Sequence, residues 1–295
     1  MAALISIGSD RLSATINPLG AELWSLTDGQ GREYMTDADP AYWSGRAPLL
    51  FPIVGALNGD RYRIDGAEHP LPKHGFARRS NFTVIDQGPD RATFRLTDSA
   101  ASRAAWPFRF GLDMAFRIEG DVLRQVATLR NPADTPLWFS FGFHPAFAWP
   151  LPGGAAKADH RVTFAAAEPA PIRRLDPPSG LVLPDPQPTP VDGRTLHLDA
   201  SLFEPDALIW DQLASRSLTY GAELGARLEI DFPDTPLLGI WQKPGAAFLC
   251  IEPWQGIADP QGWHGEFRDK PGVVELAGGA ERSFRMDVRV IPPPA

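Results

Sequence analysis

The stretch 112-LDMAFRIE-119 alternates apolar and polar side chains. Leu112, Met114, Phe116 and Ile118 are apolar, and three of the four residues that follow them are charged. Successive side chains of a β-strand point to opposite faces, so the pattern is typical of a strand with one face in a core. The alternation recurs in 11-RLSATI-16, 92-ATFRLT-97, 227-RLEIDF-232 and 284-FRMDVRV-290. The sequence therefore predicts a large, mostly antiparallel, all-β domain.

Proline is abundant, with 31 of the 295 residues, about twice its usual share. Because proline lacks a backbone N–H and breaks helices, we expect many turns and few long helices. One short helix is predicted in 98-DSAASRAAW-106, capped by Asp98 or Ser99 and closed by Pro107.

The segment 168–193 is rich in proline and polar residues. It is compatible with a linker between two domains, but strand-like sequence lies on both sides and neither half has a distinct composition. We therefore expect a long excursion within one domain that spans residues 1–295.

The formal net charge of −8 argues against a protein that binds the phosphate backbone of nucleic acid. No apolar run approaches the roughly 20 residues of a membrane helix. Residues 1–20 lack the basic and apolar regions of a secretory signal. The single cysteine, Cys250, has no partner for an internal disulfide, which suits a reducing cytosol. We expect a cytoplasmic protein that binds neither nucleic acid nor membrane.

The sequence contains no phosphate-binding Gly-rich loop, no dinucleotide-binding fingerprint, no H-E-x-x-H motif, no paired-cysteine zinc spacing and no G-x-S-x-G elbow. The remaining candidates are isolated ionisable residues in aromatic sequence. His144 lies in 138-WFSFGFHPAF-147, which otherwise reads as a buried strand, and His74 opens 74-HGFAR-78. The strand-like run in 248-FLCIEPW-254 is expected to end on Glu252, at Pro253, and partial burial there would raise the pKa of Glu252.

Each candidate also has an ordinary structural explanation. Either histidine alone is more often structural than catalytic, Glu252 alone is compatible with a turn cap, and Arg78 and Arg79 with a solvated pair. Tryptophans are more often core residues than sugar platforms, although Trp254 next to Glu252 is a candidate for stacking on a pyranose. The histidines in polar or turn sequence are expected at the surface: His69, His160, His197 and His264. The apolar run around Cys250 favours an inert buried thiol over a nucleophile.

Seven ordered blocks make the sequence similar to a known family. They are 20-GAELWSL-26, 42-YWSGRAPLLFPIVG-55, 74-HGFAR-78, 106-WPF-108, 140-SFGFHPAF-147, 206-DALIWD-211 and 248-FLCIEPW-254. On these blocks the chain resembles the aldose 1-epimerase (mutarotase) family, in particular its LacX-like and hexose-6-phosphate mutarotase-related branch. The resemblance implies a galactose-mutarotase-like fold, a large antiparallel β-sandwich with the sugar in an open cleft.

The resemblance also implies roles for matching residues. Glu252 looks like the general base, His144 like the general acid, and His74 like a second histidine that holds the sugar ring. The substrate-binding residues implied are Asp206, on a sugar hydroxyl, and the basic residues Arg78 and, less directly, Arg46. In this scheme Glu252 is ionised and His144 is protonated near neutral pH.

The implied activity is interconversion of the α and β anomers of a hexose or hexose phosphate. It requires no metal and no cofactor, and the expected partner is a small-molecule sugar, bound by a monomer or weak homodimer. The alternative is a non-catalytic carbohydrate-binding or sugar-sensing protein that uses the same cleft. A glycoside hydrolase or lyase is a third alternative, which would need a second suitable carboxylate or a tyrosine/histidine set.

One position departs from the branch. Many LacX-like sequences carry a basic residue where this chain has Ala56. The choice between a free sugar and a phosphosugar therefore stays open, although 73-KHGFARR-79 is locally basic and arginine suits phosphate.

Overall fold

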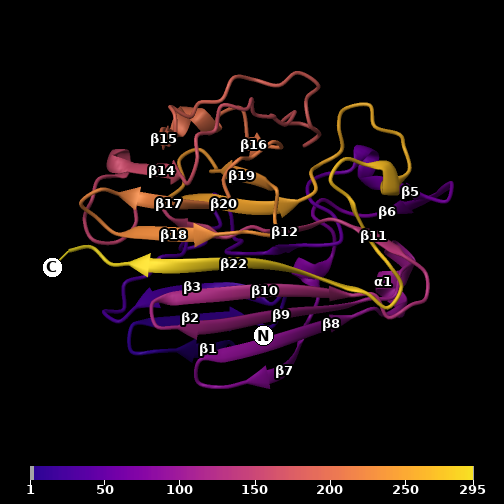
Figure 1. Cartoon of the computed structure of the whole chain (residues 1–295), viewed down its shortest axis with the longest axis horizontal. Helices are drawn as coiled ribbons and strands as arrows, with labels where there is room; N and C mark the ends of the chain where they lie inside the picture. Colours follow the sequence, from indigo (N-terminus) through magenta and orange to yellow (C-terminus); the bar gives the residue numbers. More distant parts are fainter. Residues whose placement is uncertain (1–2, 295) are drawn as a thin grey trace.

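A computed structural model describes residues 3–294 of the chain. Its named strands pair in antiparallel fashion throughout, and two large sheets dominate the fold (Figure 1). The larger sheet has nine strands in the order β15-β14-β17-β18-β22-β10-β9-β8-β7. These strands are β7 (Thr83–Gln87), β8 (Arg91–Thr97), β9 (Gly111–Glu119), β10 (Val122–Arg130), β14 (His160–Phe164), β15 (Thr195–His197), β17 (Ser217–Ala222), β18 (Arg227–Asp231) and β22 (Glu281–Ile291).

The second sheet has six strands. Five follow the order β16-β19-β20-β12-β4, and the sixth, β13, also pairs with β20. Its strands are β4 (Leu49–Leu50), β12 (Phe141–Phe143), β13 (Ala146–Ala148), β16 (Leu208–Trp210), β19 (Leu237–Trp241) and β20 (Phe248–Gln255). Because β20 pairs with strands on both of its edges, its side chains lie in the middle of the sheet.

The remaining elements are short. Three small sheets contain β1 (Ile5–Gly8), β2 (Leu12–Asn17) and β3 (Glu22–Asp28); β5 (Arg61–Ile64) and β6 (Ala67–Pro70); and β11 (Leu137–Phe139) and β21 (Val274–Leu276). The helices are α1 (Ala100–Ala105) and the 3-10 turns η1 (Asn58–Asp60), η2 (Ala77–Arg79), η3 (Lys157–Asp159), η4 (Ala200–Phe203) and η5 (Phe267–Asp269). No helix among the described residues has the length and apolar character needed to cross a membrane.

The two large sheets pack face to face. Phe141 of β12 stacks on Phe284 of β22 with ring centroids 5.0 Å apart. At another point Phe164 of β14 contacts Trp210 of β16 at 5.5 Å. Side chains from both sheets join one continuous apolar core. The predicted fold, an antiparallel β-sandwich, is confirmed.

The alternating sequence pattern accounts for the strands. Every second residue of β10 is buried, and β9 buries Leu112, Met114, Phe116 and Ile118. The five predicted strands are confirmed, as β2, β8, β9, β18 and β22. The prediction that a strand ends at Pro253 is wrong, because β20 continues through this residue to Gln255.

The predicted short helix is α1. Ser99, not Asp98, is its N-cap: the Ser102 N–H donates to Ser99 Oγ at 3.1 Å, and the Ser99 N–H donates to Ser102 Oγ at 2.8 Å. This reciprocal pair satisfies two backbone donors that the helix itself leaves free.

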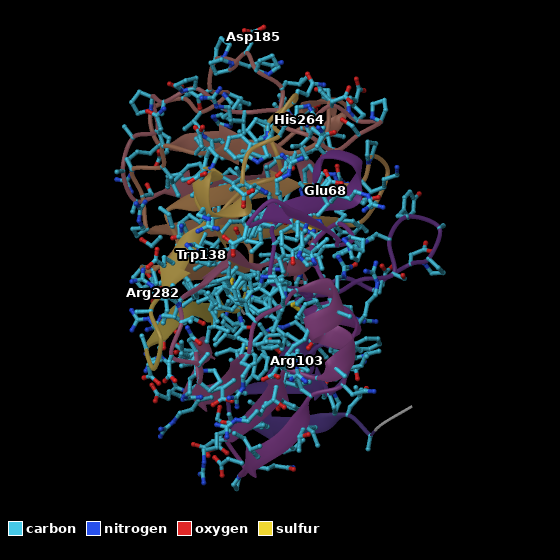
Figure 2. The ribbon with its side chains drawn as sticks, turned by 90° about the vertical axis from the view of Figure 1, so that its right-hand side faces the viewer. Glu68, Arg103, Trp138, Asp185, His264 and Arg282 are labelled. Carbon is cyan, nitrogen blue, oxygen red and sulfur yellow. The ribbon has the colours of Figure 1, made fainter. Side chains whose placement is uncertain are left out.

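Residues 165–194 form a long excursion with no strand or helix of its own between β14 and β15. Figure 2 shows Asp185 of this excursion at one tip of the molecule. The excursion folds back on itself through a bridge between Leu175 and Val182, and it joins the six-stranded sheet through a bridge between Arg173 and Ile209. Leu175 and Val182 pack in one cluster with Trp254 of β20. The excursion therefore covers part of the outer face of that sheet.

Candidate active site

A cavity of about 300 Å³ lies on the outer face of the six-stranded sheet. Ile251 of β20 points into the core between the sheets, whereas Glu252 and Trp254 line the cavity. Six of the seven site residues predicted from the sequence line it: His74, Arg78, His144, Asp206, Glu252 and Trp254. The volume is at the lower end of the range for small-molecule sites.

Glu252 and His144 touch inside this cavity. His144 lies between β12 and β13, where Gly142 pairs with Trp254 and Ala146 pairs with Cys250 of β20. This pairing brings His144 Nε2 to 3.2 Å from Glu252 Oε2. Both side chains are almost completely buried, with 7% and 2% of their surface exposed. A single ligand atom at the mouth of the pair can therefore meet both an imidazole and a carboxyl group.

Burial acts on the two groups in opposite directions. It raises the pKa of Glu252 well above its ordinary value, and the charge of Asp206 adds to this rise, while Lys73 and Arg78 oppose it. Burial also lowers the pKa of His144 well below its ordinary value, and Arg78 and Lys73 contribute to the decrease. The buried environment of the pair therefore favours a neutral carboxyl group and a neutral imidazole. This differs from the expected ionised Glu252 and protonated His144.

Trp43 was not identified from the sequence as a site residue. Its ring stacks on His144 with centroids 4.9 Å apart and an interplanar angle of 25°. Trp241 of β19 meets both rings edge-on, at 5.8 Å from Trp43 and 6.2 Å from His144. The two indoles fix the plane of the imidazole and keep water from it. Trp43 lies inside the block 42-YWSGRAPLLFPIVG-55, so the sequence located it without indicating its role.

His74 is held by the backbone of the neighbouring loop. The His74 N–H donates to the Gly55 carbonyl at 2.9 Å, and the Gly55 N–H donates to His74 Nδ1 at 3.1 Å. Because Nδ1 accepts a hydrogen bond, the ring proton is on Nε2. Gly75 has φ +70°, and a Cβ there would come within 2.3 Å of the Phe51 carbonyl oxygen, so this turn requires glycine. The turn presents His74 to the cavity as a neutral hydrogen-bond donor.

Arg78 and Lys73 bring positive charge to the cavity. Arg78 lies in η2 and is half-buried, whereas Lys73 is exposed, and both line the cavity. At the same end, a Cβ placed on Gly180 would come within 3.3 Å of the Ala56 Cβ and 3.7 Å of Lys73 Nζ. The excursion therefore occupies the space beside Ala56 that a longer side chain would need. Lys73 supplies a cation close to this position.

Asp206 reaches the cavity from the loop between η4 and β16. It has φ +72°, in the left-handed region that residues with a side chain rarely adopt. The Ala207 N–H donates to Asp206 Oδ1 at 2.6 Å, and the Asp206 N–H donates to the Phe203 carbonyl at 3.1 Å. One carboxylate oxygen is thus bound by the backbone. Asp206 is a second carboxylate in the same cavity as Glu252.

Trp254 forms part of the cavity floor. A Cβ on Gly142 would come within 2.6 Å of the Trp254 ring, and a Cβ on Gly239 within 2.5 Å. The two glycines, on the strands that flank β20, therefore make the space in which the indole lies. The cavity consequently has an aromatic floor beside the Glu252 carboxyl group.

Arg46 is not brought to the cavity. Its guanidinium donates to the backbone carbonyls of Trp24, Thr36 and Asp37, at 3.1, 2.7 and 3.1 Å. The backbone N–H of Arg46 donates to Glu22 Oε1 at 2.8 Å. These bonds join β3 to the segment that precedes β4, so the side chain supports the wall that carries Trp43.

His160 was expected at the surface, but this prediction is wrong. The residue is buried with 2% of its surface exposed, and both ring nitrogens are bonded. The Leu151 N–H donates to Nε2 at 2.9 Å, and Nδ1 lies 2.9 Å from the Ala156 carbonyl, to which it donates. Backbone groups of a nearby loop thus satisfy the ring, which polar flanking sequence does not indicate. His69 is half-buried, and His197 and His264 are exposed.

Cys250 lies close to the Glu252–His144 pair, so three potential metal ligands come together. The ligand atoms of His144, Cys250 and Glu252 lie within 4.8 Å of one another. A metal would need Cys250 as a thiolate. Burial raises the pKa of this thiol well above its ordinary value, and Glu252 adds to the rise. Cys250 is also fully buried among apolar side chains. The environment therefore suits a neutral thiol and an acid–base pair better than a metal.

The chain is similar to known proteins over nearly its whole length. The profile of the aldose 1-epimerase family matches residues 3–262. The plasmid-encoded protein LacX of Lactococcus lactis subsp. lactis is 33% identical over 283 residues, which cover 92% of this chain and 94% of LacX. The chromosomal LacX of the same organism is 32% identical over the same coverage.

Solved structures share the fold. A galactose mutarotase related enzyme from Lactobacillus acidophilus superposes with a TM-score of 0.90 at 28% identity, covering 98% of this chain and 97% of that one. A galactose mutarotase-like protein from Lactobacillus casei gives the same TM-score and identity, with 98% and 100% covered. Together with the match of the family profile, these similarities show that the chain belongs to the aldose 1-epimerase family.

Proposed function

We propose that the protein is an aldose 1-epimerase that interconverts the α and β anomers of a hexose. The observation that carries the proposal is the 3.2 Å contact between His144 Nε2 and Glu252 Oε2 inside a cavity of sugar size. Family membership supports an isomerase of this general kind, and two structural relatives are described as galactose mutarotase-related or mutarotase-like.

The reaction fits a closely spaced acid and base. Mutarotation removes a proton from the anomeric hydroxyl and delivers one to the ring oxygen; the ring opens, the C1–C2 bond rotates and the ring closes on the other face. Both oxygens are bonded to C1, so a base and an acid in contact with each other can each reach one of them. Glu252 takes the first proton and His144 gives the second.

The neutral form of the pair is compatible with these roles. Protonated Glu252 with neutral His144 holds the same number of protons as ionised Glu252 with protonated His144. Transfer of one proton along the 3.2 Å contact converts the first form into the second. The charges of Lys73 and Arg78 lower the pKa of Glu252 and so favour its carboxylate, although burial outweighs them and the same charges also lower the pKa of His144.

The other cavity residues have binding roles in this proposal. His74 donates from Nε2 to a sugar oxygen, Asp206 accepts from a hydroxyl, and Trp254 contacts the apolar face of the ring. Arg78 and Lys73 carry positive charge that also suits a phosphorylated hexose.

The test is an assay of anomer interconversion by polarimetry or NMR on glucose, galactose and glucose 6-phosphate. Turnover of at least one of them is expected, and turnover of the phosphate alone would identify Arg78 and Lys73 as phosphate ligands. The competing function is a non-catalytic sugar-binding protein. Saturable binding of a sugar with no acceleration of its mutarotation would favour that alternative, for which the Glu252–His144 contact has no purpose.

A further inference from the structure

A buried arginine lies directly behind Asp206. Arg174 belongs to the excursion and has 6% of its surface exposed. Its Nη1 donates to three backbone carbonyls, those of Leu202 at 2.9 Å, Asp206 at 2.8 Å and Ala207 at 3.3 Å. The carbonyls of Asp206 and Ala207 belong to the loop that carries Asp206 into the cavity, and that of Leu202 belongs to η4, which precedes this loop. Arg174 itself does not line the cavity.

The guanidinium keeps its charge in this position. Arginine is not deprotonated in proteins, so its burial must be compensated by nearby dipoles or anions. Here the hydrogen-bond partners of Arg174 are backbone carbonyls rather than carboxylates, and its Nε has no hydrogen-bond partner among residues 3–294. The cost of burying this charge is therefore offset by carbonyls around Asp206, so the side chain and this backbone hold each other in place.

The loop needs to be held. Asp206 adopts a left-handed backbone conformation at φ +72°, which is strained for a residue other than glycine and persists only where the surroundings enforce it. Arg174 binds the carbonyls of Asp206 and of the next residue, and that of Leu202 before the turn. The Ala207 N–H fixes Asp206 Oδ1, which leaves the other carboxylate oxygen for a ligand.

We propose that Arg174 is the positioning residue that holds Asp206 in the orientation in which it binds a sugar hydroxyl. This inference rests on the proposed sugar-binding role of the cavity. It gives the excursion a second role besides covering the sheet: Leu175 lines the cavity, and the preceding residue, Arg174, holds the loop that carries Asp206.

The neighbouring Arg173 provides a matched control. Because consecutive side chains of an extended segment point to opposite sides, Arg173 faces away from the loop. Its Nε lies 2.8 Å from Asp211 Oδ2, and about a quarter of each side chain is exposed. Arg173→Gln removes an arginine from the same segment without removing a bond to the Asp206 loop.

The experiment measures sugar dissociation constants by calorimetry, and KM and kcat by polarimetry. The variants are Arg174→Gln, Arg174→Lys, Asp206→Asn, the double variant Arg174→Gln/Asp206→Asn, and Arg173→Gln. We expect Arg174→Gln to weaken sugar binding and raise KM by about tenfold to a hundredfold, with a smaller effect on kcat. Arg174→Lys should weaken sugar binding less than Arg174→Gln does, because an ammonium group keeps the positive charge. Some loss should remain, because the ammonium group reaches fewer carbonyls. Arg173→Gln should match the wild type.

The double variant separates positioning from general stabilisation. If Arg174 acts through Asp206, Arg174→Gln should change binding by less than about threefold once Asp206 is already asparagine. Equal losses in both backgrounds, or a wild-type dissociation constant in Arg174→Gln, would overturn the inference. If Arg174→Gln does not fold, as judged by circular dichroism, the same comparison is made with Arg174→Lys. A wild-type protein that neither binds nor interconverts any hexose would instead reject the proposed function, and the role of Arg174 with it.

Discussion

Replacement of Glu252 by glutamine should greatly lower kcat and, above about pH 4.5, stabilise the protein. Glutamine has the shape of a protonated carboxyl group but cannot ionise. Burial raises the pKa of Glu252 above its ordinary value of 4.5, so the folded protein holds this proton more tightly than the unfolded chain does. Near pH 4.5 the variant and the wild type should therefore have similar free energies of unfolding.

The sign of the pH dependence follows from this shift. A raised pKa contributes stability that is fully present below pH 4.5 and is lost as the pH rises through the folded value. Each unit by which the pKa is raised corresponds to about 1.4 kcal/mol. The variant lacks this loss, so its melting temperature should exceed that of the wild type increasingly as the pH rises, by roughly 2 °C for each kcal/mol.

The partner His144 does not cancel the effect. Burial lowers its pKa below the ordinary 6.5, so its contribution is present above pH 6.5 and is lost as the pH falls through the folded value. His144 remains in both proteins. The difference between the two melting curves therefore reports mainly on Glu252 and on its interaction with His144.

The measurement is differential scanning calorimetry of both proteins from pH 4.5 upward, with polarimetry on the same samples. We expect kcat to fall by about 10²–10⁴-fold, the usual contribution of a general base. Glu223→Gln is the control, because this carboxylate is exposed and pairs with Arg161 on the surface. A difference in melting temperature that is constant with pH, or a variant that becomes less stable at high pH, would refute the reasoning from burial.

Three other substitutions test separate parts of the site. His144→Asn should lower kcat by about 10²–10⁴-fold while calorimetry shows sugar affinity close to wild type, since only the proton donor is removed; near-wild-type polarimetric rates would reject this role. His74→Asn should raise KM more than it lowers kcat, because it removes a donor to the sugar and no reacting proton; an equal loss in kcat at unchanged KM would contradict this. His160→Ala should cost roughly 1–3 kcal/mol of stability in urea unfolding, because the Leu151 N–H loses its partner, with kcat/KM unchanged.

The sandwich could be predicted from the sequence because its sheet strands carry a local signal. In β10, and in β9 apart from the buried Asp113, one face meets the core and the other is more exposed, so burial repeats every two residues. The signal fails in β20, where all residues from Phe248 to Trp254 are buried. When both faces of a strand are buried, one in the core and one in the cavity, apolar and polar residues do not alternate along it. The sequence pattern therefore does not show which residues face the cavity, or that the strand continues through Pro253.

The candidate site could be predicted only in part, for a related reason. Resemblance to a family located Glu252, His144, His74 and Asp206, which lie in recognisable blocks. Arg174 lies in the proline-rich excursion, where no periodic pattern indicates which side chains turn inward. Its position depends on the bridge between Arg173 and Ile209, a pairing of segments far apart in the sequence.

Burial of the acid–base pair bears on how a reversible reaction can use it. With ordinary pKa values of 4.5 for Glu252 and 6.5 for His144, a shared proton would prefer the imidazole, and Glu252 would be the weaker base. Burial raises the pKa of Glu252 and lowers that of His144. It therefore opposes this preference and favours a protonated carboxyl group. Mutarotation runs in both directions through the same open chain, so each group must accept the proton in one direction and return it in the other. In the proposed mechanism the proton lies on Glu252 in the buried pair and crosses the 3.2 Å contact to His144 when Glu252 acts as the base, and it returns by the same contact in the other direction.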